Sequence, residues 1–457
     1  MAELIMSIDA GTTGIKTLVV SPDSSVVGRG YAEFSQSFPK PGWVEHDPDE
    51  IWDTTVKVMH QALEDAGASA TDIAGIGITD QRETTVLWDR SNGRPVAPAI
   101  VWQDRRTAPI CERLKAQGLE DEIRRRTGLV LDPYFSGTKI MWLLDEVEGL
   151  RKRADAGEIA FGTIDCWLIY KLTGGLVHAT EPSNASRTLL YSLQEQGWDE
   201  WVLEQLDIPS QILPDIQPSS GIFGNTTADL FDGVEIPITG AAGDQQAALF
   251  GQACFEKGMA KNTYGTGSFV LMNTGSTPTM SEHGLLTSAG WMIGDTLDYV
   301  LEGSIFVTGA AIQWMRDGLG MISEASETGP LAESVPDAGD TYFVPAFVGL
   351  GAPHWDPYAR AAWIGITRGT TTAHLARAVV EAMAYQTRDV VEAMSADAGS
   401  PPLELRVDGG ASVMDLLCQI QADQLGIVVR RPENLETTAM GAAYLAGLAQ
   451  GVWSGTS

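Results

Sequence analysis

The chain has few cysteines, no long apolar run and no surplus of positive charge, and each shortage excludes a class of protein. Its four cysteines lie far apart without a C-x-x-C pair, which argues against a disulfide framework or a zinc site and favours a reducing, cytoplasmic setting. The six histidines are equally scattered, and we expect surface or core residues rather than metal ligands. No apolar run is long enough to span a bilayer. The start of the chain also lacks the basic residues of a signal peptide.

The net charge is −30, from 60 acidic and 30 basic residues. Such a field disfavours nucleic acid and anionic membranes as partners. The acidic residues are dispersed and form no block, so we interpret them as a solubility feature rather than an interaction surface. Any bound phosphate must therefore be neutralised locally, by backbone dipoles, a few basic residues and Mg²⁺.

At 457 residues the chain is too long for one hydrophobic core, and the sequence predicts two α/β domains, residues 1–250 and 251–457. Strands and helices alternate through about residue 240, the pattern of a mostly parallel sheet covered on both faces. One helix is predicted to begin at Pro48, with Asp47 as its cap and Glu50 completing a capping box. Its predicted apolar face consists of Trp52, Val56, Met59 and Leu63, and Gly67 is predicted to end the helix.

One short signature occurs twice, at Ile5–Thr13 and at Asn262–Gly267. Each copy predicts a strand, a tight Gly-Thr turn and a second strand. Glycine allows close approach of a ligand to the backbone, and the hydroxyl and N–H groups of the turn can point at anionic oxygens. A single copy would favour an ordinary hairpin, but two copies favour a polyphosphate held from both sides. The candidate residues are Thr12, Thr13, Gly265 and Thr266.

Three further features fit phosphoryl transfer, which needs a nucleotide cradle, a metal and a base. Lys16 is close enough in sequence to the first turn to reach a phosphate. Asp9 ends the first strand, where a carboxylate can hold Mg²⁺ directly or through water. A third turn, at Asp408–Ala411, fits a nucleotide's base and ribose, although a close-packing turn has the same pattern.

On the acceptor side, Asp244 stands where a loop of small residues enters a helix. Helix capping explains a carboxylate there, but a general base also needs a fixed orientation, so Asp244 is the candidate base. Arg82 and Glu83 follow a buried strand and offer a donor and an acceptor to a polyol, although a surface salt bridge is the simpler reading of the pair alone. Trp102 and Tyr134 offer flat apolar faces to a carbon skeleton, although each residue alone is more typical of a core.

These residues lie in long segments that resemble the FGGY carbohydrate kinases of the actin-like ATPase superfamily, and most of all the branch that phosphorylates glycerol. The segments are Pro41–Pro48, Gly77–Thr85, Asp132–Lys139, Gly243–Gly251 and Asn262–Gly267. The resemblance covers essentially the whole chain. It implies a ribonuclease-H-like core in each lobe, with glycerol and phosphate bound by residues 1–250 and the nucleotide by residues 251–457.

The resemblance also assigns residues. Those matching the family's glycerol ligands are Arg82, Glu83, Trp102, Tyr134, Asp244 and Gln245, with Asp244 as base. Those matching its nucleotide contacts are Thr12, Thr13, Lys16, Thr266, Gly309, Gln313 and Gly410. Met414 stands where an adenine-contacting Asn is frequent, Ala10 where Gln is usual and Asp104 where Cys is usual. The loop at residues 225–232 lacks the Gly/Arg character that binds fructose 1,6-bisphosphate, so that inhibition is not expected.

The sequence therefore predicts ATP- and Mg²⁺-dependent phosphorylation of glycerol to sn-glycerol 3-phosphate, the first step of glycerol catabolism, in the cytoplasm. The family implies a homodimer or homotetramer. Two alternatives stay open. One is a related kinase acting on a pentulose, a tetritol or dihydroxyacetone. The other is a non-catalytic actin-like nucleotide-binding protein, which Met414 and the early C-terminus motivate.

Overall fold

The computed structural model describes residues 3–356 and 358–456. The chain divides into two compact units. Unit 1 comprises Met1–Ala253, Ser288–Tyr299 and Thr438–Ser457, and unit 2 comprises Cys254–Thr287 and Val300–Thr437. Across the described ranges, no helix combines the length and the apolar character that a membrane span requires.

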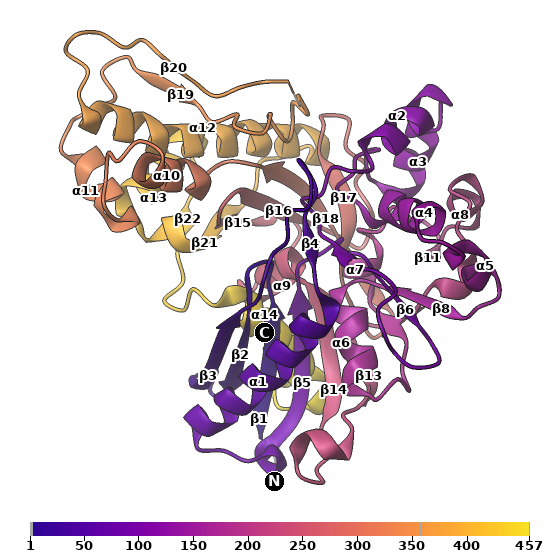
Figure 1. Cartoon of the computed structure of the whole chain (residues 1–457). Helices are drawn as coiled ribbons and strands as arrows, with labels where there is room; N and C mark the ends of the chain where they lie inside the picture. The colour runs from indigo at the N-terminus through magenta and orange to yellow at the C-terminus, as the bar shows by residue number, and fades with distance from the viewer. Residues whose placement is uncertain (1–2, 357, 457) are drawn as a thin grey trace. The chain divides into compact units, whose positions relative to one another are not determined.

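Unit 1 is built on a mixed sheet (Figure 1). Its strands, in the order β13-β14-β5-β1-β2-β3, are β13 (Ser220–Asn225), β14 (Pro237–Gly243), β5 (Ile73–Asp80), β1 (Leu4–Ala10), β2 (Gly14–Val20) and β3 (Val26–Glu33). The central pairs β14–β5 and β5–β1 are parallel. The pairs β1–β2, β2–β3 and β13–β14 are antiparallel. The mostly parallel sheet predicted from the sequence is therefore mixed, because hairpins supply its outer strands.

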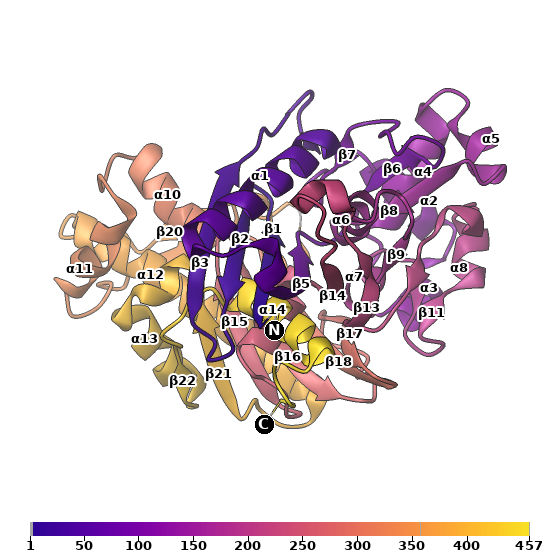
Figure 2. The same ribbon diagram turned by 90° about the horizontal axis from the view of Figure 1, so that it is seen from below.

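Helices cover both faces of this sheet. Along β1, Met6 and Ile8 pack in a cluster with helix α1 (Pro48–Ala66). Ile5 packs with helix α14 (Thr437–Gln450), and the Ser7 hydroxyl donates to the Ala439 carbonyl of the same helix. Since alternate residues of a strand point to opposite faces, α1 and α14 lie on opposite sides of β1, as Figure 2 also shows. The last helix of the chain thus packs on its first strand.

Helix α1 begins and ends as the sequence predicts. Asp47 accepts a hydrogen bond of 2.9 Å from the Asp49 N–H, and Gly67 ends the helix in the left-handed conformation. The predicted capping box is wrong. The Glu50 carboxylate instead accepts from the N–H and hydroxyl of Ser35, each at 3.0 Å, and so ties α1 to the segment after β3.

The predicted apolar face of α1 is confirmed in part, since Met59 and Leu63 are buried while Val56 is only partly buried. Trp52 is only partly buried, whereas Val58 and Ala62 are fully buried. Their carbonyl oxygens lie 2.2 and 2.3 Å from where a Cβ would stand on Gly30 and Gly28 of β3. The glycines let the helix backbone lie directly on the strand, and this close approach selects which face of α1 turns inward.

The other elements of unit 1 surround the sheet. Its remaining helices are α2 (Ala108–Ala116), α3 (Glu120–Thr127), α4 (Ser136–Glu146), α5 (Leu150–Asp155), α6 (Ile164–Leu172), α7 (Pro182–Ala185), α8 (Glu200–Gln205) and α9 (Asp244–Gly251). Its short strands are β4 (Glu45–His46), β6 (Val86–Asp89), β7 (Ala99–Ile100), β8 (Ile159–Gly162), β9 (Ala179–Thr180), β10 (Tyr191–Ser192), β11 (Gly197–Trp198) and β12 (Asp215–Ile216). Helix α9 starts at Asp244, as predicted.

Unit 2 contains four strands that pair side by side. The strands β22 (Val429–Arg430), β21 (Glu404–Asp408), β15 (Met259–Tyr264) and β16 (Ser268–Gly275) lie in that order. Strands β17 (Leu286–Ile293) and β18 (Thr296–Ile305) contribute residues to both units, and β19 (Tyr342–Val344) pairs with β20 (Ala362–Ile364). The helices are α10 (Gly309–Asp317), α11 (Thr328–Glu333), α12 (Thr372–Ala398) and α13 (Asp415–Leu425). Helix α12 is capped by Thr371, and His374 completes a capping box with it.

A histidine in unit 1 lowers the stability of the folded protein as the pH becomes acidic. The His178 Nε2 lies 2.7 Å from the Phe161 carbonyl oxygen, and burial lowers the pKa of the imidazole from 6.5 to about 4. As the pH falls, the unfolded chain takes up this proton first, so stability is lost between about pH 6.5 and pH 4. From pH 7 to pH 5 the loss attributable to His178 is about 2 kcal/mol.

The variant His178→Gln keeps a donor for the carbonyl and removes the titration. Urea unfolding of both proteins at pH 7 and pH 5 isolates the histidine, because the contributions of other ionisable groups cancel in the difference. We expect the wild type to lose about 2 kcal/mol more than the variant. Equal losses would show that His178 titrates alike in the folded and unfolded chains.

Candidate active site

The predicted site residues of unit 1 follow the carboxyl ends of neighbouring parallel strands. The register places Asp9 of β1 beside Thr79 of β5, and Gly243 of β14 beside Asp80 of β5. Open α/β sheets bind ligands at the carboxyl ends of their strands. The end of β1, the Arg82-Glu83 pair and the start of α9 therefore share one edge of the sheet, which we take as the candidate site of unit 1.

Asp244 is held in a fixed orientation at this edge. Its Oδ1 accepts from the Gln245 N–H at 2.7 Å and lies 3.1 Å from the Arg82 Nε. The Asp244 side chain is 30% exposed, whereas that of Arg82 is 2% exposed. Arg82 in turn donates from Nη1 to the Gln246 Oε1 at 3.1 Å. A carboxylate that is oriented by a buried cation and still reaches solvent has the geometry required of a general base.

Glu83 is buried and held in an unusual backbone conformation. Its φ is +62°, in the left-handed region that a non-glycine residue seldom adopts. The Arg187 Nε lies 2.6 Å from the Glu83 Oε1, and both side chains are almost fully buried. The Arg187 Nη1 donates to the Ser288 hydroxyl at 3.0 Å. Strain of this kind persists only where the surroundings enforce it, and it is typical of functional sites.

Trp102 links the predicted polyol residues to the first Gly-Thr turn. Its indole N–H donates to the Thr12 hydroxyl at 2.9 Å. Its ring meets the ring of Tyr134 edge-on, with centroids 5.7 Å apart. The Arg187 guanidinium lies 5.3 Å from the centre of the Tyr134 ring. The two aromatic residues, Glu83 and the turn are thus joined through direct contacts within unit 1.

The first Gly-Thr turn joins β1 and β2, which pair antiparallel as predicted. The Gly11 N–H donates to the Gly14 carbonyl at 3.1 Å, and Gln81 Nε2 donates to the Gly11 carbonyl at 3.1 Å. Lys16 lies opposite Asp9 in the register. Thr13 is exposed at the tip. The turn presents a hydroxyl, backbone donors and a nearby lysine, which suits an anionic ligand.

The second Gly-Thr turn joins β15 and β16, again antiparallel as predicted. The start of α10 packs directly on it. The Gly309 N–H donates to the Gly265 carbonyl and the Ala310 N–H to the Thr266 carbonyl, both at 3.0 Å. A Cβ on Gly309 would stand 2.5 Å from the Gly265 oxygen. Gly309 therefore belongs to the same local structure as the turn, whereas Gln313 is exposed further along α10.

The third turn follows β21. Space is open around Gly410, where a Cβ would meet no atom within 4 Å. Met414, at the start of α13, is partly buried and packs against the core of unit 2. Its Sδ lies 3.8 Å from the Cβ position of Gly329 in α11. Met414 thus combines a packing role with a position near the open turn.

The predicted residues fall into two groups, one in each unit. Unit 1 contains Asp9, Thr12, Thr13, Lys16, Arg82, Glu83, Trp102, Tyr134, Asp244 and Gln245. Unit 2 contains Gly265, Thr266, Gly309, Gln313, Gly410 and Met414.

Three residues in contact with the site of unit 1 were missed from the sequence. Arg187 pairs with Glu83, and Gln246 accepts from Arg82. Lys139 is fully buried and donates to the Tyr134 carbonyl, and burial lowers the pKa of its amine to about 8. The available signal for Arg187 and Lys139 was that each is a basic residue among buried neighbours. Basic side chains are seldom buried without a partner, so both pointed to a partner in the site.

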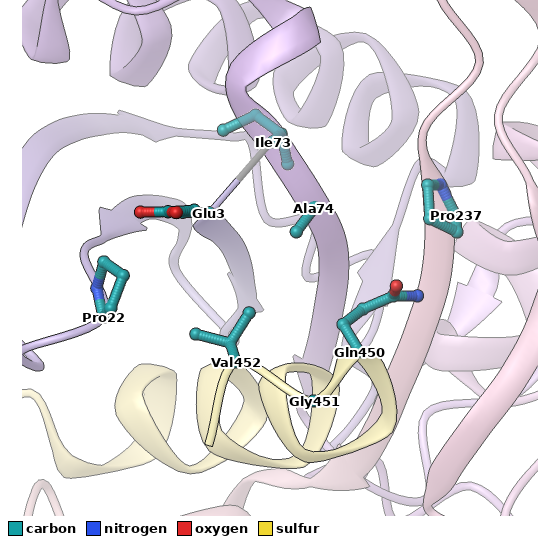
Figure 3. Close-up of a pocket in the computed structure, with 8 residues that line it drawn as sticks. All are labelled: Glu3, Pro22, Ile73, Ala74, Pro237, Gln450, Gly451 and Val452. Carbon is teal, nitrogen blue, oxygen red and sulfur yellow. The ribbon is translucent and has the colours of Figure 1, made fainter. Parts of the chain in front are cut away.

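A hollow of about 610 Å³ lies elsewhere in unit 1 (Figure 3). Its lining includes Ile73 and Ala74 at the start of β5, and Gln450 and Val452 at the end of the chain. Asp80 stands at the other end of β5, so the hollow is separate from the candidate site. Glu3 is the one charged residue among the eight that line it, which leaves the hollow without the groups needed for catalysis.

In the described part of the chain, no group of three or more His, Cys, Asp or Glu side chains is arranged to hold a metal ion. Mg²⁺ bound to nucleotides typically keeps several waters and takes one or two protein carboxylates together with phosphate oxygens. Asp9, at the end of β1 and beside the first Gly-Thr turn, fits that smaller requirement.

Comparison with known proteins places this geometry in a family. The chain matches the N-terminal domain of the FGGY family of carbohydrate kinases over residues 4–251 and the C-terminal domain over residues 260–450. It is 59% identical to glycerol kinase 2 of Thermotoga maritima, over 98% of this chain and 90% of that protein. It is 57% identical to the glycerol kinase of Petrotoga mobilis, over 100% of this chain and 91% of that protein.

Solved structures agree. The crystal structure of Plasmodium falciparum glycerol kinase with ADP superposes with a TM-score of 0.93 at 35% identity, covering 99% of this chain and 90% of that one. The ligand-bound xylulose kinase of Lactobacillus acidophilus superposes with a TM-score of 0.89 over 99% of this chain and 90% of that one. At 21% identity this second likeness shows the fold alone.

Proposed function

Since the chain belongs to the FGGY family of carbohydrate kinases, we propose that it transfers the γ-phosphoryl group of ATP to glycerol and forms sn-glycerol 3-phosphate. The observation that carries the proposal is the arrangement of Arg82, Glu83 and Asp244 at one sheet edge, with Asp244 oriented and partly exposed. The identity to several glycerol kinases over nearly the whole chain supports the same acceptor.

We propose that glycerol lies between Arg82, Glu83 and the Trp102–Tyr134 pair. The guanidinium supplies donors, the carboxylate supplies acceptors, and the ring faces pack on the carbon skeleton. Gln245 adds an amide next to the base. A buried, strained Glu83 suits a short polyol, because its carboxylate is fixed by Arg187 and cannot swing away to admit a longer sugar.

Asp244 takes the proton from the terminal hydroxyl as that oxygen attacks the γ-phosphorus in line. The Arg82 Nε, 3.1 Å from the Asp244 Oδ1, keeps the carboxylate oriented. The proton therefore moves to an Asp244 oxygen while the phosphorus–oxygen bond to ADP breaks. Little other covalent chemistry is required, since phosphoryl transfer depends mainly on positioning and charge stabilisation.

We propose Thr12, Thr13, Gly265 and Thr266 of the Gly-Thr turns as nucleotide-binding residues. Lys16, Gly309, Gln313, Gly410 and Met414 complete the nucleotide set. Asp9 would hold Mg²⁺, which supplies charge neutralisation at the phosphates when it is bound. In this proposal residues 1–250 bind glycerol and phosphate, and residues 251–457 bind the nucleotide.

The proposal extends to the setting of the enzyme. Among the described residues, none of the four cysteines forms a disulfide, which suits the reducing cytoplasm. We propose a cytoplasmic enzyme that works as a homodimer or homotetramer.

Gly410→Ala tests the nucleotide assignment without a packing defect. Because a Cβ there meets no protein atom within 4 Å, we expect an unchanged melting temperature. A methyl group in space used by the nucleotide should raise the KM for ATP by roughly tenfold, which corresponds to about 1.4 kcal/mol of binding free energy. Gly455→Ala, at another glycine with open surroundings, is the matched control. An unchanged KM for ATP would remove Gly410 from the nucleotide site.

The proposed reaction is tested with Mg-ATP and a panel of acceptors: none, glycerol, dihydroxyacetone, erythritol and xylulose. ADP release that depends on glycerol supports the proposal. Faster release with xylulose or erythritol would indicate another substrate of the family. ATP binding without release from any acceptor would indicate a non-catalytic nucleotide-binding protein.

A further inference from the structure

A buried carboxylate outside the proposed substrate contacts is connected to the base. Glu181 is fully buried and caps helix α7. Its Oε1 accepts from the Asn184 N–H at 2.7 Å and from the Ser183 hydroxyl at 2.5 Å. Its Oε2 accepts from the Ser183 N–H at 2.8 Å and from the Ser219 hydroxyl at 2.7 Å. Both oxygens thus use two acceptor positions, the full capacity of an ionised carboxylate.

Ser183 and Ser219, the two residues whose hydroxyls donate to Glu181, also hold the backbone that precedes Asp244. The Ser183 hydroxyl accepts the Gly243 N–H at 2.8 Å, one residue before Asp244. The Ser219 carbonyl accepts the Ala241 N–H at 2.9 Å. With its hydroxyl hydrogen directed to Glu181, Ser183 keeps its lone pairs for Gly243. Glu181 therefore fixes the end of β14 through two serines.

The segment that contains Glu181 and Ser183 also contacts the residues at and after the end of β5. Asn184 donates from Nδ2 to the Asp80 Oδ1 at 2.9 Å, two residues before Arg82. Arg187 pairs with Glu83. Residues 181–187, which we call the bracket, thus connect the ends of β5 and β14 that carry Arg82 and Asp244.

We propose that Glu181 is a positioning residue for Asp244 and that it acts in its ionised form. This inference rests on the proposed phosphorylation of glycerol. A proton on Glu181 would occupy one acceptor position and would have to be donated to Ser183 or Ser219. A proton donated to Ser183 competes with the Gly243 N–H for the lone pairs of the Ser183 hydroxyl, and Asp244 then loses its alignment with the glycerol hydroxyl. A proton donated to Ser219 competes in the same way with the Met292 N–H, which the Ser219 hydroxyl accepts at 3.0 Å.

Burial raises the pKa of Glu181 from 4.5 to about 7, so the carboxylate changes its protonation state near neutral pH. The Asp165 carboxylate of α6 raises the pKa further, while bonds from Ser183 and Ser219 lower it. Tyr191 of β10 also faces Glu181, and burial keeps that phenol neutral by raising its pKa. Activity that needs ionised Glu181 falls as the pH drops through about 7.

The experiment compares the wild type with Glu181→Gln and Ser183→Ala in glycerol kinetics from pH 5.5 to pH 9. In Glu181→Gln an amide NH₂ must face at least one backbone N–H. We expect kcat to fall about 10- to 100-fold, the scale of a small misplacement of a reacting group, while the KM for glycerol changes less than threefold. In the wild type we expect kcat to fall as the pH drops below about 7, and we call this part of the pH profile the acid limb. It should disappear in this variant. Ser183→Ala removes the link to Gly243 and keeps Glu181, so we expect a lower kcat with the acid limb retained.

The matched control is Asp199→Asn, since Asp199 is a buried helix-capping carboxylate in unit 1 that caps α8. It should leave kcat and the acid limb unchanged. If Glu181→Gln fails to fold, the kcat of Ser183→Ala tests the positioning role. The acid limb of the wild-type pH profile then tests whether Glu181 acts in its ionised form. Wild-type kinetics in the variants would overturn the positioning role and leave the proposed function intact. A wild type inactive with every acceptor would overturn both.

Discussion

Replacing Asp244 with Asn is expected to lower kcat for glycerol phosphorylation by about 10²- to 10⁴-fold, the usual contribution of a general base. The amide keeps an oxygen that can accept from the Gln245 N–H and the Arg82 Nε, so its orientation is preserved. Only the capacity to take the proton is lost. Glycerol and ATP should bind nearly as in the wild type, because the remaining contacts are unchanged.

Steady-state kinetics and calorimetric binding of glycerol separate these effects. Asp199→Asn is again the control, because Asp199 also starts a helix and pairs with an arginine, Arg126, at 3.2 Å. We expect wild-type turnover in the control. Near-full kcat in Asp244→Asn would show that another group removes the proton, and a large loss of glycerol binding would indicate a role in binding instead.

Breaking the buried pair of Glu83 and Arg187 should have the largest effect on stability. Their side chains are almost fully buried, with Nε and Oε1 2.6 Å apart. Removing one partner leaves a buried charge without compensation, which typically costs about 3–5 kcal/mol. We therefore expect Arg187→Met alone to unfold at clearly lower urea concentration than the wild type.

The double variant Glu83→Gln with Arg187→Met separates stability from function. With both charges gone, part of the lost stability should return, because a neutral pair carries no unpaired charge. Glycerol turnover should stay low, because the acceptor carboxylate is missing. A double variant with normal KM and kcat for glycerol would exclude Glu83 from the acceptor site. Additive losses of stability would show that the two side chains are not coupled.

The sequence carries enough information for the local structures that hold the site. The two strand–turn–strand segments, the start of α1 at Pro48 and the start of α9 at Asp244 follow from glycine, proline and capping patterns. These features depend on neighbouring residues, so a single sequence reveals them. The roles of Asp244, Arg82 and Glu83 stay predictions until the variants are measured.

Long-range packing is less accessible from the sequence. No local signal shows that the helix containing Ala439 lies against Ser7, 432 residues earlier. The full burial of Val58 and Ala62 in α1 was not predicted, because the approach of the helix backbone to Gly28 and Gly30 decides it. The bracket was missed because α7 has only four residues, too few for a periodic pattern. Its buried polar groups become informative only when their partners are known.

The most direct test of the account follows both products of one reaction. Phosphorus NMR of the protein with Mg-ATP and glycerol should show a new phosphomonoester, sn-glycerol 3-phosphate, accumulating in equal amounts with ADP. Without glycerol neither product should form at a comparable rate. ADP accompanied by inorganic phosphate, or no ADP at all with glycerol present, would contradict the assignment of this chain as a kinase that phosphorylates glycerol.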